Sequence, residues 1–114
     1  MAVDFLSPSG GTPANEDAAR EAIGKLDLGK SVSDAVAMLD ELATSSRGGK
    51  VAAVGFCGGG GSVTRLAVAA GDKLAAGVPY YGPAPDPSEA EKVAAPLLIH
   101  DAGLDERVNR TSFP

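Results

Sequence analysis

The sequence predicts an α/β protein with a three-layer α/β/α arrangement, in which helices cover both faces of a parallel β-sheet. Apolar runs typical of buried strands recur along the chain, at residues 50–56, 74–81 and 96–100. Segments whose apolar residues recur at three- and four-residue spacing, as in amphipathic helices, separate such runs. Strands that alternate with helices form parallel sheets of βαβ units. Because 114 residues is the size of one domain, we expect residues 1–114 to form a single one.

Three elements are predicted in the first half of the chain. Residues 2–6 form a short apolar run that a cluster of Ser, Pro and Gly ends, which predicts a strand. Thr12 is a candidate N-cap followed by Pro and acidic residues, so a helix is expected from about Pro13 to Ile23. The clearest amphipathic helix runs from Leu28 to Ala43, and the polar residues 44–49 are expected to end it as a loop.

The second half of the chain contains the predicted sheet. Residues 51–54 are apolar without alternation, which predicts a central strand buried on both faces. A helix follows, which Gly71 can terminate, with one apolar face (Val63, Leu66, Ala67 and Ala70). Residues 74–81 and 96–100 are the second and third strands, and residues 88–93 are long enough only for a short helix.

Composition excludes several classes of function. The net charge is −5 and no cluster of Lys and Arg occurs, so nucleic acid is not an expected partner. A single cysteine allows no internal disulfide, no Cys/His pairing predicts a metal site, and the first residues carry no signal sequence. The apolar stretches are shorter than the roughly 18 residues that span a bilayer, so no membrane interaction is expected. We therefore expect a cytoplasmic protein.

The segment from Gly55 to Gly59, GFCGG, carries the chemistry. It matches G-x-C-x-G, the cysteine version of the G-x-S-x-G nucleophile elbow, and it lies between a buried strand and a helix. The turn of such an elbow is tight, so small residues must flank the nucleophile. A thiol at a helix N-terminus is favoured as its thiolate. Cys57 is therefore the candidate nucleophile, and the backbone N–H of Gly58 is a candidate oxyanion donor, a group whose removal typically costs on the order of 3 kcal/mol of barrier.

Other interpretations of this segment are weaker. Free cysteine is often a small buried hydrophobe, but the four consecutive glycines that follow Cys57 argue against a merely packed position. A glycine loop can also bind phosphate at a helix N-terminus, yet no Lys follows as a P-loop requires, and the last glycine of G-x-G-x-x-G is replaced by Val63. Sites in parallel sheets lie at the carboxyl ends of the strands. Cys57, Tyr81 and Asp105 are therefore expected at one end of the sheet.

At three places the sequence resembles the dienelactone hydrolase family, α/β-hydrolases that use a cysteine nucleophile. These are Gly55 to Gly59, GVPYYGPAPD at residues 77–86 and APLLIHDAGLDERVN at residues 95–109. The resemblance implies a partial α/β-hydrolase fold and a hydrolase of lactone or ester bonds. It implies that Cys57 is the nucleophile and that Asp105 is the acid that orients the catalytic histidine. Such chemistry needs no metal or cofactor.

The sequence also departs from the family pattern. The resemblance places the histidine downstream of Asp105 and a bulky residue at the position of Gly58, and it also implies earlier strands and a second oxyanion donor. We therefore expect an internal fragment of the family fold that is inactive, or nearly so, as this chain. His100 precedes Asp105 and is expected mainly to have a structural or pocket-lining role. Tyr81 is a candidate substrate-binding residue, although aromatic residues at strand ends more often serve packing.

The different-class alternative is a non-catalytic remnant or an α/β module that assembles. Without one of the family's strands, the sheet would have a gap or an exposed strand edge. Exposed strand edges favour pairing with another chain, so a homo-oligomer formed through them is expected.

Overall fold

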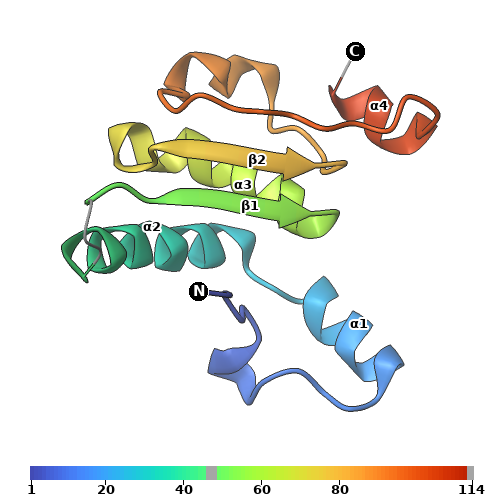
Figure 1. Ribbon diagram of the computed structural model, residues 1–114. Coiled ribbons are helices and arrows are strands. Elements are labelled where there is room, and N and C mark those ends of the chain that lie inside the picture. The colour runs from blue at the N-terminus through green and yellow to red at the C-terminus, as the bar shows by residue number, and fades with distance from the viewer. Residues whose placement is uncertain (46–48, 113–114) are drawn as a thin grey trace.

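The computed structural model describes residues 1–45 and 49–112, and Figure 1 shows the arrangement of its elements. In chain order the described elements are η1 (Ser7–Ser9), α1 (Glu16–Gly24), α2 (Leu28–Ser45), β1 (Ala52–Phe56), α3 (Gly58–Ala70), η2 (Gly71–Lys73), β2 (Ala76–Tyr80), η3 (Pro87–Lys92) and α4 (Glu106–Ser112). Of the predicted loop at residues 44–49, residues 46–48 lie outside the described residues, and residues 44 and 45 instead continue α2. None of the helices in the described parts is long and apolar enough to cross a membrane.

The sheet is parallel, as predicted. β1 and β2 pair from Ala52 opposite Ala76 to Phe56 opposite Tyr80, and α3 connects them. The third predicted strand, residues 96–100, lies along the other edge of β2 and forms two parallel bridges, at Gly77 with Leu97 and at Tyr80 with His100. The sheet order is therefore β1, β2 and then this third segment.

A proline explains why the third segment is bridged only at its two ends. Gly77 N donates to Pro96 O at 3.0 Å, and Leu98 N donates to Gly77 O at 2.9 Å. The next donor in a parallel ladder would be the backbone N–H of residue 79, which is a proline and has none. Pairing resumes one step later, where His100 N donates to Pro79 O at 3.0 Å.

The core lies between two helices and one face of the sheet. α3 packs on both strands and α2 packs on α3, and Figure 1 shows both helices alongside the strands. The apolar positions of the predicted helix at residues 58–70 are buried as expected, and Ala67 is fully covered. The buried cluster consists of Leu39, Leu66, Ala67, Ala70, Leu74 and Ala95.

Two predictions about the opposite face of the sheet are wrong for the described residues: that β1 is buried on this face, and that helices cover it. Val54 is 62% exposed and Phe56 is 58% exposed, so β1 is not buried on both faces. The third layer of helices is likewise not seen on this face in the described residues. The physical reason lies in the alternation of side chains along a strand. Gly55 points toward the helices and is buried, whereas its neighbours point the other way, where no described element covers them.

The predicted strand at residues 2–6 is wrong. These residues end in a turn, in which Asp4 Oδ1 accepts a hydrogen bond from Leu6 N at 2.9 Å and Asp4 O accepts one from Ser7 N at 3.2 Å. A strand is stable only when its backbone pairs with a neighbour, and here the aspartate carboxylate offers the backbone a local alternative. The chain then enters η1 directly.

The first helix begins later than predicted. Its N-cap is Asn15, whose side chain accepts a hydrogen bond from Ala18 N at 3.0 Å, and not Thr12. Asparagine is at least as good an N-cap as threonine, and from position 15 it places Glu16 and Asp17 in the first turn, where the helix dipole favours them. The end of the helix at Gly24 lies within one residue of the predicted end.

Candidate active site

Cys57 is the single residue between the end of β1 at Phe56 and the start of α3 at Gly58. Its backbone has φ 55° and ψ −120°, a conformation that is uncommon for a residue with a side chain. The surrounding backbone fixes it, because Cys57 N donates to Tyr80 O at 3.0 Å and Cys57 O accepts from Gly61 N at 3.2 Å. The side chain is exposed and makes no capping hydrogen bond. This is the strained strand-to-helix turn that the G-x-C-x-G motif predicts, with Cys57 at its apex.

Two glycines near Cys57 are required by the close approach of backbone. A Cβ atom at Gly55 would overlap the carbonyl group of Gly59, and one at Gly60 would lie 2.6 Å from Tyr80 O and 3.1 Å from Gly82 Cα. A Cβ atom at Gly82 would in turn overlap the backbone of Gly60 and Gly61. The first turn of α3 therefore packs directly on the loop after β2, with no side chain between them.

Two other glycines of this segment, Gly58 and Gly59, have open space, whereas a Cβ atom at Gly61 would lie 3.0 Å from the side chain of Pro83. Among the described residues, a Cβ atom at Gly58 or Gly59 would meet nothing within 4 Å. The structure therefore leaves room for a side chain at Gly58. Small residues are predicted at both glycine positions of G-x-C-x-G. The prediction is confirmed for position 55 and wrong for position 59. Sequence reasoning missed Gly60, although the run of four glycines was a signal of close backbone packing.

Gly58 is the first residue of α3. Because the first intrahelical hydrogen bond runs from Gly61 N to Cys57 O, the backbone N–H groups before Gly61 belong to the open N-terminal turn. They lie at the positive end of the helix dipole, beside the cysteine. The geometry therefore suits Gly58 N–H to a negatively charged oxygen formed next to Cys57.

Backbone hydrogen bonds join the carboxyl ends of the three strands. Besides the bond from Cys57 N to Tyr80 O, Tyr81 N donates to His100 O at 2.7 Å. Tyr81 has a positive φ of 38° and is 41% exposed, so its ring is available at this end of the sheet. The carboxyl end of the sheet therefore holds Cys57, Tyr81 and the start of the loop that leads to Asp105. This is the end at which sites in parallel sheets lie.

Three rings stack across the sheet, one each from the carboxyl ends of β1, β2 and the third segment. The centroids of Phe56 and Tyr80 are 4.8 Å apart, and those of Tyr80 and His100 are 4.3 Å apart with their planes 5° from parallel. The imidazole therefore packs flat on Tyr80, which favours the structural interpretation of His100. Sequence reasoning missed this stack, because it depends on the register that places residues 56, 80 and 100 side by side.

Asp105 caps the last helix. Its Oδ1 accepts hydrogen bonds from Arg107 N at 3.1 Å and from Val108 N at 3.0 Å, and it lies at the N-terminus of α4. Among the described residues, Oδ2 accepts no hydrogen bond, and none joins the side chains of Cys57, His100 and Asp105. The carboxylate is thus fixed by one oxygen and open at the other.

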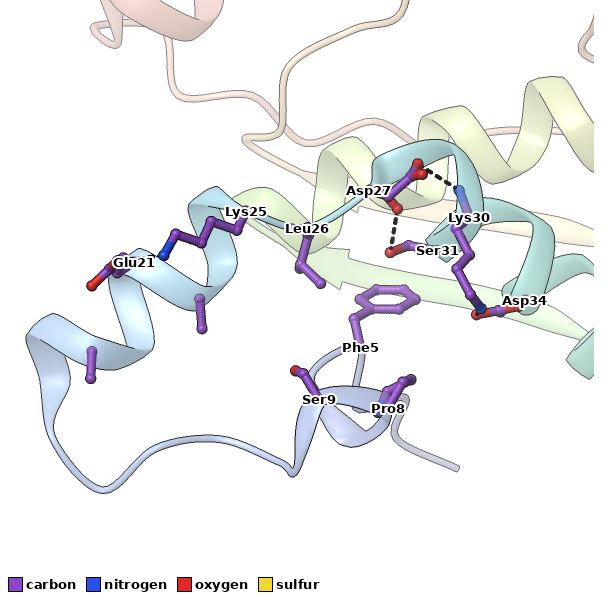
Figure 2. A pocket seen from close by; sticks show the side chains of 12 residues that line it. Phe5, Pro8, Ser9, Glu21, Lys25, Leu26, Asp27, Lys30, Ser31 and Asp34 are labelled. Atoms are coloured by element: carbon purple, nitrogen blue, oxygen red, sulfur yellow. Dashed lines mark hydrogen bonds and ion pairs between the residues drawn. The ribbon is translucent and has the colours of Figure 1, made fainter.

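A cavity of about 510 Å³ lies elsewhere, between the N-terminal segment, α1 and the first turns of α2 (Figure 2). Phe5 and Leu26 contribute apolar surface to it, whereas Lys30 pairs with Asp34 at its rim. All of its lining residues lie between positions 5 and 34, so it shares none with the elbow. The candidate active site is therefore the carboxyl end of the sheet at Cys57, and this cavity is a separate feature.

Parallel strands joined by a helix define an α/β protein, and a cysteine lies at the strained turn between strand and helix. The chain belongs to the dienelactone hydrolase family, whose model matches residues 4–113. Membership of that family implies the α/β-hydrolase fold, of which the described residues form a helical layer and a small parallel sheet. Comparison with curated proteins finds no match to the chain.

Proposed function

We propose that this protein hydrolyses lactone or ester bonds, with Cys57 as the nucleophile, Gly58 N–H as an oxyanion donor and Asp105 as the acid that orients a histidine. The observation that carries the proposal is the backbone at Cys57, where a positive φ presents the thiol at the open N-terminus of α3. The family supports hydrolase chemistry. The exposed ring of Tyr81, at the same edge, would contact the substrate.

The reaction proceeds in two halves. The histidine takes the thiol proton, and the sulfur of Cys57 attacks the carbonyl carbon to form a tetrahedral intermediate whose oxygen is bound by Gly58 N–H. The carbon–oxygen bond of the ester then breaks, and the leaving alkoxide takes the proton from the histidine. Water attacks the resulting thioester with the histidine as base, which releases the acid and restores the thiol.

The histidine of this mechanism is not assigned to His100. The ring of His100 is stacked on Tyr80. The backbone N–H of His100 donates to Pro79 O, and its carbonyl accepts from Tyr81 N. Residues 1–114 would therefore supply the nucleophile and the acid without sustaining turnover by themselves. The unbound Oδ2 of Asp105 is the atom to which the histidine would donate.

Trapping the acyl-enzyme tests the proposal. The full-length protein is mixed with p-nitrophenyl acetate, quenched in acid and digested, and the acyl group is located by mass spectrometry. We expect one acetyl group, on the peptide that contains Cys57, together with release of p-nitrophenol. Cys57→Ala should release none above background. Acylation elsewhere, or none on a thiol that still reacts with iodoacetamide, would refute the proposed nucleophile.

A second candidate function is assembly into homo-oligomers, and the uncovered face of the sheet favours it. Val54, Phe56 and Leu98 are each more than half exposed. In the described residues, β1 is paired only with β2, so its other edge is open to a second copy of the chain. Light scattering across a range of protein concentrations tests this candidate. A mass that rises with concentration, and falls in Val54→Thr, supports assembly, whereas a constant monomer mass removes it.

A further inference from the structure

The loop that carries Asp105 is closed by a side chain from α4. Asn109, which is half-buried, lies one helical turn after Asp105. Its Nδ2 donates two hydrogen bonds, to Ala102 O at 3.2 Å and to Gly103 O at 3.1 Å. The two carbonyl groups fix the orientation of the amide, because the reverse orientation would place its oxygen against both of them.

The same loop is held by the backbone on either side of Asp105. Asp105 N donates to Ala102 O at 2.9 Å, and Asn109 N donates to Asp105 O at 2.9 Å. Ala102 O therefore accepts from Asp105 N and also from the Asn109 side chain. Together with the bonds to Oδ1 of Asp105, these contacts close a small hydrogen-bonded ring from residue 102 to residue 109.

Besides the backbone bond from Asp105 N to Ala102 O, the described residues make no hydrogen bond to residues 102–104 other than those of the Asn109 amide. Gly103 is exposed, and Leu104 is 98% exposed and therefore packs on almost nothing. Asn109 Oδ1 is buried and has no hydrogen-bond partner among the described residues, so the side chain is not placed there to satisfy its own oxygen. Its Nδ2 bonds to the loop are the interactions that explain its position.

We propose that Asn109 is a positioning residue, which holds residues 102–105 so that Oδ2 of Asp105 faces the histidine. This inference rests on the proposed function, because it assigns a task to Asn109 only if Asp105 is the acid. Asn109 does not touch the substrate in this scheme. Its effect on the reaction passes entirely through Asp105, and that property distinguishes it from a residue that merely stabilises the fold.

A double-mutant cycle in the full-length protein tests this property. The variants are Asn109→Ala, Asp105→Asn and the pair, and the readouts are kcat and KM for p-nitrophenyl acetate. We expect Asn109→Ala to lower kcat between about tenfold and a hundredfold, as a small misplacement of a catalytic group does, with KM unchanged. Asn109→Ala should cause no further loss when Asp105 is already Asn.

Two further variants separate positioning from folding. Asn109→Asp keeps the shape of the side chain but lacks both donors, so it should lose as much kcat as Asn109→Ala. Arg110→Ala removes the neighbouring side chain of α4, whose ion pair with Glu106 is fully on the surface, and should leave kcat unchanged. In ¹⁵N relaxation measurements, Asn109→Ala should increase the mobility of the Gly103 amide, and Arg110→Ala should not.

Three results would overturn the positioning role of Asn109. Losses that multiply in the double variant, or a Gly103 amide that stays rigid in Asn109→Ala, overturn the positioning role. A kcat for Asn109→Ala equal to that of Arg110→Ala also overturns it. If the unmodified full-length protein forms no acyl group on Cys57, the proposed function fails first, and the role of Asn109 fails with it.

Discussion

Two adjacent glycines of α3, Gly59 and Gly60, are expected to respond in opposite ways to a single added methyl group. At Gly60 the new Cβ would lie 2.6 Å from Tyr80 O and 3.1 Å from two backbone atoms of Gly82. Ordinary carbon–oxygen contacts are about 3.3–3.6 Å, so the backbone would have to separate by about 0.7–1.0 Å. At Gly59 the same methyl group meets nothing within 4 Å.

The expected stabilities follow from these contacts. Gly60→Ala is an overpacking substitution that only backbone movement can relieve, and such changes cost about 1–3 kcal/mol. Gly59→Ala gains helix propensity, worth up to about 1 kcal/mol. We therefore expect the free energy of unfolding to differ by about 1–4 kcal/mol between two variants of identical composition.

Urea unfolding followed by circular dichroism measures this difference. The midpoints should separate with Gly60→Ala the lower, while the slope of free energy against urea stays the same in both. Gly58→Ala is a second control, since its Cβ also meets nothing within 4 Å. Equal midpoints for the two variants, or a more stable Gly60→Ala, would refute the backbone contact between α3 and the loop after β2.

Two further predictions concern strain and charge. Cys57→Gly should unfold at a higher urea concentration than Cys57→Ala, because glycine adopts the φ of 55° without strain of about 1–3 kcal/mol; equal midpoints would show that the elbow is relaxed. Hydrogen bonds from Ser88 Oγ and then Ser88 N hold the pKa of Asp86 below its ordinary value of 3.8. This stabilising contribution is present above pH 3.8 and is lost as the pH falls through the lower folded pKa. An NMR titration should therefore find the Asp86 pKa higher in Ser88→Ala, and an unchanged value would contradict the assignment.

The elements predicted best from sequence are those whose pattern is local and repeated. The helix from Leu28 and the helix that ends at Gly71 both show apolar residues at helical spacing, and both formed. The expected face of α3 is buried, whereas the expected face of α2 is half-buried around the buried Leu39. The run at residues 2–6 has only composition to support it, and a strand needs a partner that composition does not reveal. The exposed face of Val54 has the same cause, because burial depends on what packs against a strand and not on its own sequence.

The candidate site also contains features that local sequence predicts and features that depend on contacts between distant segments. The turn at Cys57 was predictable because G-x-C-x-G between an apolar run and a helical pattern has a mechanical reason that is local. The stack of Phe56, Tyr80 and His100 was not, because it depends on strand register between segments far apart in sequence. The role of Asn109 was missed for another reason. Its amide bonds to backbone carbonyls, which every residue has, so no residue type in the loop marks the contact.

The missing N–H of Pro79 has a consequence for how the sheet opens. Between the bridge at Gly77 and the one at Tyr80, the third segment has one ladder hydrogen bond fewer than a regular parallel strand would have. Cooperative units of a protein open where few backbone bonds hold them. The segment that ends at His100 should therefore detach from β2 at a lower free energy than β1 does. Native-state hydrogen exchange should find the amide of Leu98 exchanging through a partial opening while β1 and β2 remain paired.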